Sequence, residues 1–165
     1  MKLLKGFVAV VALLALGAFA YALARPAPLA PAVQLTSLKG ESIDTSRLRG
    51  KVLVVSFWST TCGICLHEMP DLVERHRALA ARGYETIAIA TYKDDLERVR
   101  ELAARKKLPY AIAFDRNASA SKAFGDVRLT PTTFVIDRRG RILKRYVGRT
   151  PWKEFDALVE RALAL

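Results

Sequence analysis

The chain has 165 residues, with 27 basic and 16 acidic residues and a formal net charge of +11. This length suits one domain of ordinary size with a short appendage. The basic excess does not indicate a nucleic-acid-binding protein, because no aromatic residues interleave with the densest basic stretches to stack on bases. A solvated basic face, of the kind that anionic lipid headgroups attract, is the simpler explanation.

The N-terminal segment is apolar. Lys2 and Lys5 precede an uncharged stretch from Gly6 to Ala24, which as a helix would reach roughly 28 Å, close to the thickness of a bilayer core. A cleaved secretory signal is the competing interpretation, with Ala22-Leu23-Ala24 as its cleavage site, although the apolar region of a signal is only about 7–15 residues long. We therefore expect residues 1–24 to be a membrane anchor or, alternatively, a signal peptide. In both cases the N-terminal lysines stay in the cytoplasm and the remainder is exported.

A Pro/Ala-rich segment at residues 25–32 lacks any periodic pattern. It predicts an extended, semi-stiff linker that lifts the domain off the membrane. The globular domain then covers residues 33–165.

The elements of this domain alternate between strands and helices. In chain order we expect a hairpin formed by 33–35 and 42–44, a strand at 52–58, a helix from 65 to about 82, a strand at 84–92, a helix at 94–107, a strand at 110–114, a short helix at 118–124, a hairpin formed by 132–136 and 141–147, and a last helix. Thr150 is expected to cap this last helix and Pro151 to be its first residue. The order predicts an α/β domain, with one mixed sheet covered by helices on both faces.

The two cysteines of the chain, Cys62 and Cys65, lie where the strand at 52–58 gives way to a helix. Thiols at i and i+3 in a first helical turn can close a small disulfide and reopen it. The helix N-terminus also stabilises a thiolate. A structural disulfide across so short a loop would add little stability, so the position favours redox chemistry.

The residues around the pair carry a resemblance to a known family. The run Phe57-Trp58-Ser59-Thr60-Thr61-Cys62-Gly63-Ile64-Cys65-Leu66-His67-Glu68-Met69-Pro70 resembles the active-site segment of thioredoxin-fold proteins, and more narrowly that of the membrane-anchored TlpA/ResA family of thiol–disulfide oxidoreductases. The run Leu129-Thr130-Pro131-Thr132-Thr133-Phe134 is similar to the family segment that bears a cis-proline. The resemblance covers about 33–165. It implies a thioredoxin-like fold with an N-terminal hairpin and a central helix–strand insertion at 94–114, and no cofactor.

The resemblance also implies a role for each thiol and for Glu68. Cys62 attacks a substrate disulfide, and the more buried Cys65 then resolves the mixed disulfide. Glu68 tunes thiol ionisation or shuttles a proton to Cys65. The alternative for Glu68 is an ordinary exposed acid that favours the helix dipole. Ser56 stands where thioredoxin has a buried aspartate, so proton transfer would rely on Glu68 or water.

Three further residues are implied in substrate binding. Pro131, if cis, places backbone groups of Thr130 beside Cys62, where they pair with an extended substrate segment, and it keeps metals off the thiols. Trp58 packs beside the site and screens it, or is a plain core tryptophan. Thr61 departs from the family pattern, because many relatives have a second tryptophan there.

These features predict a disulfide reductase on the periplasmic side of a bacterial inner membrane, with a cytoplasmic N-terminus. If the signal is cleaved, a soluble periplasmic protein is expected. The expected partners are exported proteins with disulfides or thiols, such as apocytochrome c or copper-site proteins. The family also implies an upstream membrane thiol-relay protein as reductant.

Metal-binding and peroxidase functions are the alternatives. A Cu(I) chaperone could use the same two thiols, but relatives specialised for copper add a distant histidine, and none follows His76. A zinc site would need His67 and His76 at an unusual spacing, so we predict no metal. A thiol peroxidase needs proline and threonine where Val55 and Ser59 stand.

Overall fold

The computed structural model describes residues 13–17 and 27–165. Residues 13–17 are helical. The remainder of the predicted anchor or signal at 1–24 lies outside the described residues. Within the two described ranges, no helix is long and apolar enough to cross a membrane.

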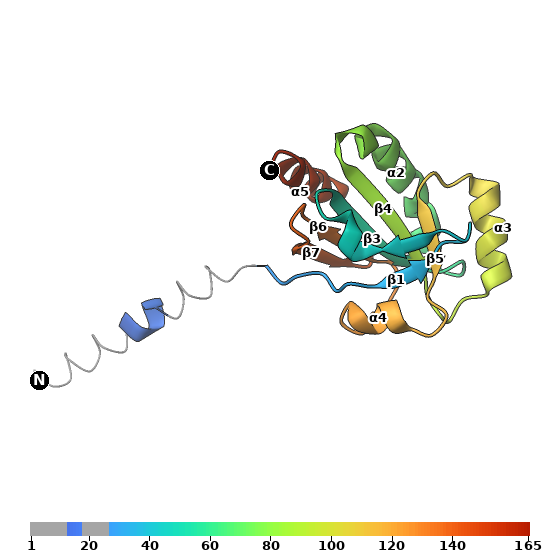
Figure 1. The fold of residues 1–165 in the computed structure, drawn as a ribbon, viewed down its shortest axis with the longest axis horizontal. Helices are drawn as coiled ribbons and strands as arrows, with labels where there is room; N and C mark the ends of the chain where they lie inside the picture. Colours follow the sequence, from blue (N-terminus) through green and yellow to red (C-terminus); the bar gives the residue numbers. More distant parts are fainter. Residues whose placement is uncertain (1–12, 18–26) are drawn as a thin grey trace, which may run out of the picture.

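A five-stranded mixed sheet forms the centre of the domain (Figure 1). Its strands, in spatial order, are β5 (Ala111–Phe114), β4 (Tyr84–Ala90), β3 (Val52–Trp58), β6 (Thr132–Ile136) and β7 (Ile142–Val147). Strands β3, β4 and β5 are parallel, whereas β6 runs antiparallel to β3 and β7 antiparallel to β6. The central strand β3 is buried along its whole length, which explains its continuous apolar sequence.

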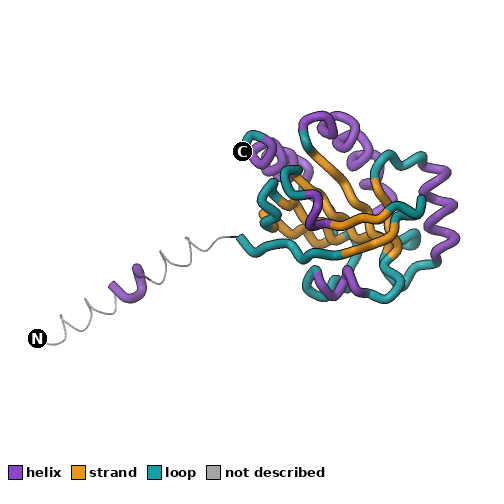
Figure 2. Tube along the Cα trace, in the orientation of Figure 1, coloured by secondary structure: helices purple, strands orange, loops and turns teal. Residues whose placement is uncertain are grey.

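Helices cover both faces of this sheet (Figure 2). The helices α2 (Gly63–Leu79), α3 (Leu96–Lys106) and α5 (Trp152–Leu163) pack into one apolar cluster with alternate residues of β3, among them Val52, Val54 and Trp58. The other residues of β3, Leu53, Val55 and Phe57, belong to a second cluster. Short helix α4 (Ser119–Ala123) contributes to this second cluster, together with the N-terminal hairpin of β1 (Gln34–Thr36) and β2 (Ser42–Asp44). The predicted α/β architecture is therefore confirmed.

Single-turn 3₁₀ helices η1 (Thr45–Leu48) and η2 (Ala80–Arg82) complete the elements. The predicted hairpin turns at Lys39-Gly40, and Gly40 has the positive φ of 86° that glycine adopts without strain.

Three helix starts differ from the prediction because a residue next to the predicted start takes the N-cap position. Helix α2 begins at Gly63 rather than Cys65, since Cys62 is its N-cap and its sulfur accepts the backbone N–H of Cys65. Helix α3 begins at Leu96 rather than 94, since Asp95 is its N-cap. At α5 the predicted cap was wrong: Pro151 occupies the N-cap position, and Thr150 binds Glu68 instead.

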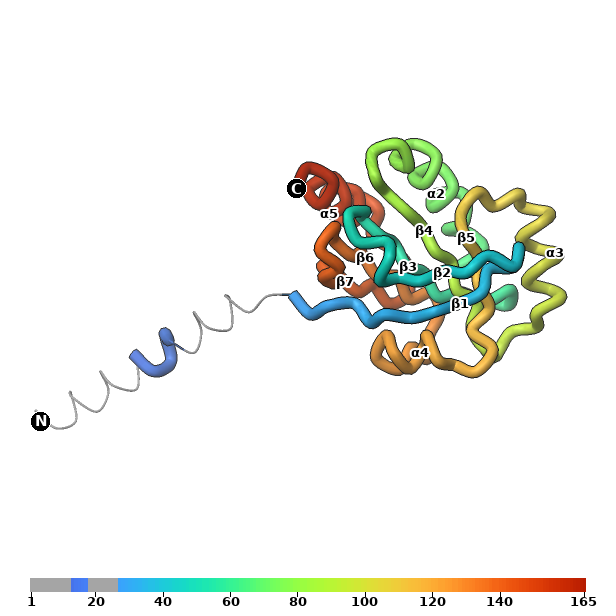
Figure 3. The backbone as a smooth tube through the Cα atoms, viewed as in Figure 1, coloured from blue at the N-terminus to red at the C-terminus, as the bar shows by residue number. Residues whose placement is uncertain are grey.

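Part of the predicted linker lies against the domain. The carbonyl of Pro28 accepts the N–H of Ile142, and the N–H of Ala30 donates to the carbonyl of Gly140. The blue segment that leads to β1 therefore runs beside the start of β7 before it reaches the hairpin (Figure 3).

This entry point lies at the opposite end of the sheet from Cys62. Cys62 follows the carboxyl end of β3, whereas the turn at 137–141 follows the carboxyl end of β6. Because β6 is antiparallel to β3, with Leu53 opposite Ile136, the two turns lie at opposite ends of these strands. The chain thus enters the domain far from its cysteine pair.

Candidate active site

The cysteine pair forms a disulfide at the start of α2. The Cα atoms of Cys62 and Cys65 are 5.2 Å apart and their sulfurs are bonded. Cys62 is partly exposed, whereas Cys65 retains only 4% of its accessible surface. The two thiols therefore differ in access, with Cys62 the one that a protein substrate can reach.

Glu68 lies one turn beyond Cys65 on the buried side of α2. Only 4% of its surface is accessible. Its Oε1 accepts the backbone N–H of Thr150 at 2.6 Å, and its Oε2 accepts the Thr150 hydroxyl at 3.1 Å. Burial excludes the alternative of an ordinary exposed first-turn acid. The two donors satisfy a carboxylate that would otherwise be costly to bury.

A small void lies beneath the disulfide and brings the predicted site residues together. It has a volume of about 10 Å³, at the lower limit for a water molecule. Its lining residues include Trp58, Cys65, Glu68, Tyr110 and Pro131. Burial raises the pKa of Tyr110 above its usual value, so this phenol stays protonated at neutral pH. Glu68 and Cys65 thus share one largely apolar space in which a proton could pass between them.

Trp58 is part of the core as well as of the site. It is 2% exposed and packs in the same cluster as Cys65. Its indole Nε1 finds no hydrogen-bond partner among the described residues. Trp58 is therefore both a core residue and a wall of the void.

The peptide bond between Thr130 and Pro131 is cis, as the resemblance implied. Pro131 is buried and its carbonyl accepts the N–H of Gly148. Thr130 is only partly buried. Beside it, the Thr132 hydroxyl donates to the carbonyl of Leu129 at 2.8 Å. This segment leads directly into β6, which pairs with β3 as far as Phe57.

The predicted departure at Ser56 has a structural counterpart. The Ser56 hydroxyl lies 3.1 Å from the Thr133 hydroxyl across the β3–β6 pair, and both side chains are buried. Ser56 also lines the void. A neutral pair of hydroxyl groups therefore stands at the position where thioredoxin has a buried aspartate. Glu68 is therefore the carboxylate that this void holds.

Two residues of the site were missed from the sequence. Thr150 binds Glu68 across 82 residues of sequence. Asp94 accepts hydrogen bonds from the backbone N–H and hydroxyl of Thr60, two residues before Cys62. Thr150 was expected to cap the last helix, and Asp94 to be the first residue of the helix at 94–107. No local pattern distinguishes those roles from a long-range contact.

The fold, the disulfide and the void define a protein that exchanges thiols and disulfides. The sequence model of the family described as Redoxin matches residues 26–162. The chain belongs to the Redoxin family.

Curated relatives and a solved structure agree with this assignment. The chain is 35% identical over 125 residues to the thiol-disulfide oxidoreductase ResA of Geobacillus kaustophilus, covering 76% of the chain and 70% of the relative. It is 33% identical over 126 residues to ResA of Halalkalibacterium halodurans, with the same two coverages. A thiol:disulfide interchange protein of the thioredoxin family from Chlorobium tepidum superposes with a TM-score of 0.76 at 30% identity, covering 85% of this chain and 98% of the other. The protein is therefore a thiol–disulfide oxidoreductase of the ResA type, with Cys62 and Cys65 as its CxxC pair.

Proposed function

We propose that the protein reduces disulfides in exported proteins at the periplasmic face of a bacterial inner membrane, where residues 1–24 tether it. The observation that carries the exchange mechanism is the asymmetry of the pair. Cys62 is accessible at the helix start, while Cys65 is buried beside the Glu68 carboxylate. An accessible attacking thiol and a shielded resolving thiol are what a two-step exchange requires.

The reaction starts from the dithiol form. The Cys62 thiolate attacks one sulfur of the substrate disulfide, that bond breaks, and the other substrate sulfur leaves as a thiolate and takes up a proton. Cys65 then loses its proton and attacks the Cys62 sulfur. The mixed disulfide breaks, the second substrate thiol is released, and the Cys62–Cys65 disulfide forms. Two electrons and two protons have passed to the substrate, and an upstream membrane thiol relay restores the dithiol.

Glu68 is proposed to take the proton from Cys65 in the second step. Both groups line the same void, and the Thr150 hydrogen bonds hold the carboxylate in place. Proton acceptance at that point promotes attack, because the thiolate is the nucleophile.

The substrate groove is proposed to lie between Cys62 and the cis-proline segment. The half-buried Thr130 precedes Pro131 and would offer its backbone groups to an extended client segment. The proposed clients are apocytochrome c or copper-site proteins. Relatives at 33–35% identity that are named thiol-disulfide oxidoreductase ResA support the thiol–disulfide exchange in this proposal.

Trapping of mixed disulfides tests the two cysteine roles. A full chain with Cys65→Ser should accumulate mixed disulfides with exported proteins through Cys62, visible on non-reducing gels and identifiable by mass spectrometry. A Cys62→Ser chain should trap none, because Cys65 is buried. Equal trapping by the two variants would contradict the assignment.

An activity assay separates reduction from metal binding. The dithiol form should reduce insulin disulfides. A dithiol form that leaves insulin unreduced but binds one Cu(I) per chain tightly would instead favour the chaperone alternative.

Protease treatment of spheroplasts should cleave the domain if it faces the periplasm, and resistance that ends on lysis would contradict that location.

A further inference from the structure

The loop that presents Cys62 is held by a carboxylate from outside its own segment. Oδ2 of Asp94 accepts the backbone N–H of Thr60 at 2.5 Å, and Oδ1 accepts the Thr60 hydroxyl at 2.6 Å. Oδ1 also accepts the N–H of Asp95 at 2.8 Å. Asp94 belongs to the loop between β4 and α3, which is 34 residues away in sequence. A bidentate, charge-assisted contact of this kind fixes both partners.

Other contacts show that this loop and the Cys62 loop form one unit. The N–H of Thr91 donates to the carbonyl of Trp58, so the two chains run together where β3 and β4 end. Asp94 is further fixed because its N–H donates to the carbonyl of Thr91. Thr60 is therefore clamped to a segment that is itself anchored to the sheet.

Inside the Cys62 loop, the hydrogen bonds lead from the clamp to the thiol. Ser59 accepts the N–H of Thr61 on its hydroxyl at 3.2 Å and the N–H of Cys62 on its carbonyl at 3.1 Å. Consecutive Cα atoms are about 3.8 Å apart, so the Cα atoms of Thr60 and Cys62 lie within about 7 Å. The Asp94 carboxylate consequently places a negative charge in the neighbourhood of the Cys62 thiol.

We propose that Asp94 is a positioning residue for Cys62: its carboxylate clamps the loop at 59–61 to the β4–α3 loop and keeps a negative charge on the loop that presents the attacking thiol. The inference rests on the proposed attack by Cys62. The clamp holds the thiol in the orientation that attack requires. The charge disfavours the thiolate, because like charges repel, and so opposes the thiolate-stabilising effect of the α2 N-terminus.

Other ionisable side chains surround this loop and remain constant in the test. Lys93 and Asp95 flank Asp94 on its own loop, and α2 contributes His67 and Glu68. Arg128 stands on the segment before the cis-proline, where it pairs with Asp126. Asp95 offers a matched control, because it carries the same charge one residue away but binds the N–H of Arg98 rather than Thr60.

The experiment compares Asp94→Ala, Asp94→Asn, Thr60→Val and Asp95→Asn in the full chain. For insulin reduction we expect Asp94→Ala to lose about tenfold in kcat/KM, since small misplacements of reacting groups are costly. Asp94→Asn should stay within about twofold, because its amide oxygen can still accept the Thr60 N–H. Thr60→Val should fall between the two, and Asp95→Asn should match the unsubstituted protein.

The pH profile of Cys62 alkylation in the dithiol form supplies a measurement that a purely structural contact would not change. Both Asp94 variants should shift the midpoint down by a few tenths of a pH unit, because a nearby negative charge is lost. Thr60→Val keeps that charge and should leave the midpoint unchanged.

If Asp94→Ala only lowers the melting temperature, with turnover and midpoint equal to those of Asp95→Asn, the proposal is wrong. Failure of the underlying role of Cys62 is separately visible, because the Cys65→Ser chain with native Asp94 would then trap no client.

Discussion

Two polar side chains on the α2 side of the sheet, buried Glu68 and half-buried His76, have different surroundings. Glu68 receives two hydrogen bonds from Thr150. His76, further along α2, leaves its buried Nδ1 without a partner among the described residues. Instead, its ring meets the rings of Tyr110 and Tyr84 at centroid distances of 5.7 and 6.5 Å. Hydrogen bonds thus hold the Glu68 carboxylate, whereas aromatic packing holds the His76 ring and burial lowers its pKa.

Loss of the Thr150 hydroxyl should destabilise the protein. Thr150→Val keeps the backbone donor and the side-chain shape but leaves the buried Glu68 carboxylate with one hydrogen bond fewer. We expect a cost of about 1.5–3 kcal/mol in urea unfolding, the range for hydrogen bonds to charged groups. Thr36→Val, at an exposed position of β1, is the control and should change stability by less than about 0.5 kcal/mol. Equal effects of the two substitutions would show that the Glu68–Thr150 contact is not stabilising.

His76 should make stability depend on pH. Burial lowers the pKa of His76 below its ordinary value of 6.5. The unfolded chain therefore takes up this proton at a higher pH than the folded protein, and stability should fall as the pH drops through 6.5. His76→Phe keeps the aromatic packing and should reduce the change in urea midpoint between about pH 7.5 and 5.5. Carboxylates titrate below this range, so they contribute little to that change. His67→Gln, at an exposed position, should leave that slope as it is. An unchanged slope in His76→Phe would assign the pH dependence to other groups.

At the scale of elements, a half-buried arginine joins α2 to α5. Arg75 donates from Nε and Nη2 to the two carboxylate oxygens of Asp156 at 2.6 and 2.8 Å, and its guanidinium lies 4.1 Å from the ring centroid of Trp152. Its side chain is 15% exposed. A second bidentate pair, Arg82 with Glu160, joins η2 to the same helix at a site about half exposed on both sides.

These two pairs should differ in strength. Arg75→Lys loses the planar fork and the stacking on Trp152, and we expect it to cost about 0.5–1 kcal/mol in chemical unfolding. Arg82→Lys should cost close to nothing, because solvent screens an exposed pair. The Arg75 effect should persist in 0.5 M salt, since stacking and partial burial are screened less. Indistinguishable losses would mean that burial and stacking do not matter here.

The elements predicted best were those that the local sequence describes fully. Strands β3 and β6 start and end as predicted, because an unbroken apolar run bounded by polar turns shows both limits of a buried strand. The starts of α3 and α5 were misplaced, because Asp94 and Thr150 bind partners 34 and 82 residues away. The same separation in sequence explains which parts of the site were predicted. The cysteine pair is local in sequence, whereas Asp94, which holds the Cys62 loop, and Thr150, which holds the Glu68 carboxylate, come from other segments.

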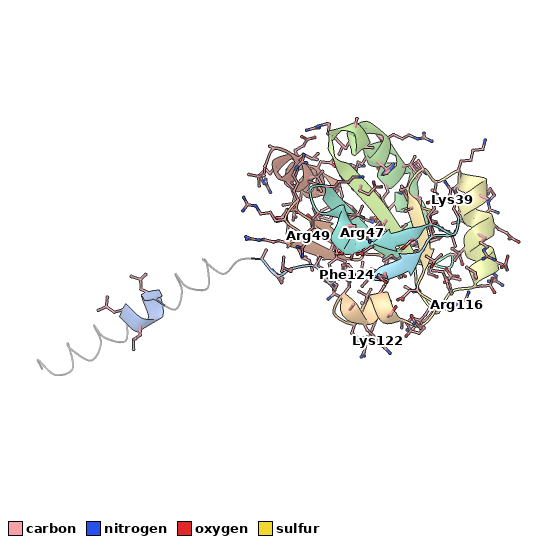
Figure 4. All side chains as sticks on the ribbon, viewed as in Figure 1. Lys39, Arg47, Arg49, Arg116, Lys122 and Phe124 are labelled. Carbon is pink, nitrogen blue, oxygen red and sulfur yellow. A yellow bond between two sulfur atoms is a disulfide. The ribbon has the colours of Figure 1, made fainter. Side chains whose placement is uncertain are left out.

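At the scale of the whole molecule, basic side chains collect at the end where the chain enters. Arg49 lies on that side of the domain in Figure 4, and its side chain is next to Gly140 in the turn at 137–141. Arg138 donates to the carbonyls of Gly50, Arg82 and Leu163, which ties this end together. With Cys62 at the opposite end of the sheet, the proposed tether would place the basic end towards the membrane and the active site away from it.

This polarity predicts two different distances from the bilayer in full-length protein reconstituted into vesicles. A fluorophore on Arg139→Cys, in a chain with both native cysteines replaced by serine, should be quenched by lipids that carry a nitroxide headgroup. A fluorophore on Cys62 in the Cys65→Ser chain should be quenched much less. Adding anionic lipid should strengthen quenching at 139, and salt should reverse that gain, because headgroup attraction is screened beyond a Debye length.

The basic residues at the entry end should cause the lipid dependence. Arg49→Gln combined with Arg141→Gln should abolish the gain from anionic lipid. The matched pair Arg98→Gln and Arg100→Gln, at exposed positions in the first half of α3, should retain the gain because α3 begins after the carboxyl end of β4, away from the entry end. Equal quenching at 62 and 139 would contradict the orientation, since opposite ends of one sheet cannot both rest on the bilayer while the chain enters at one of them.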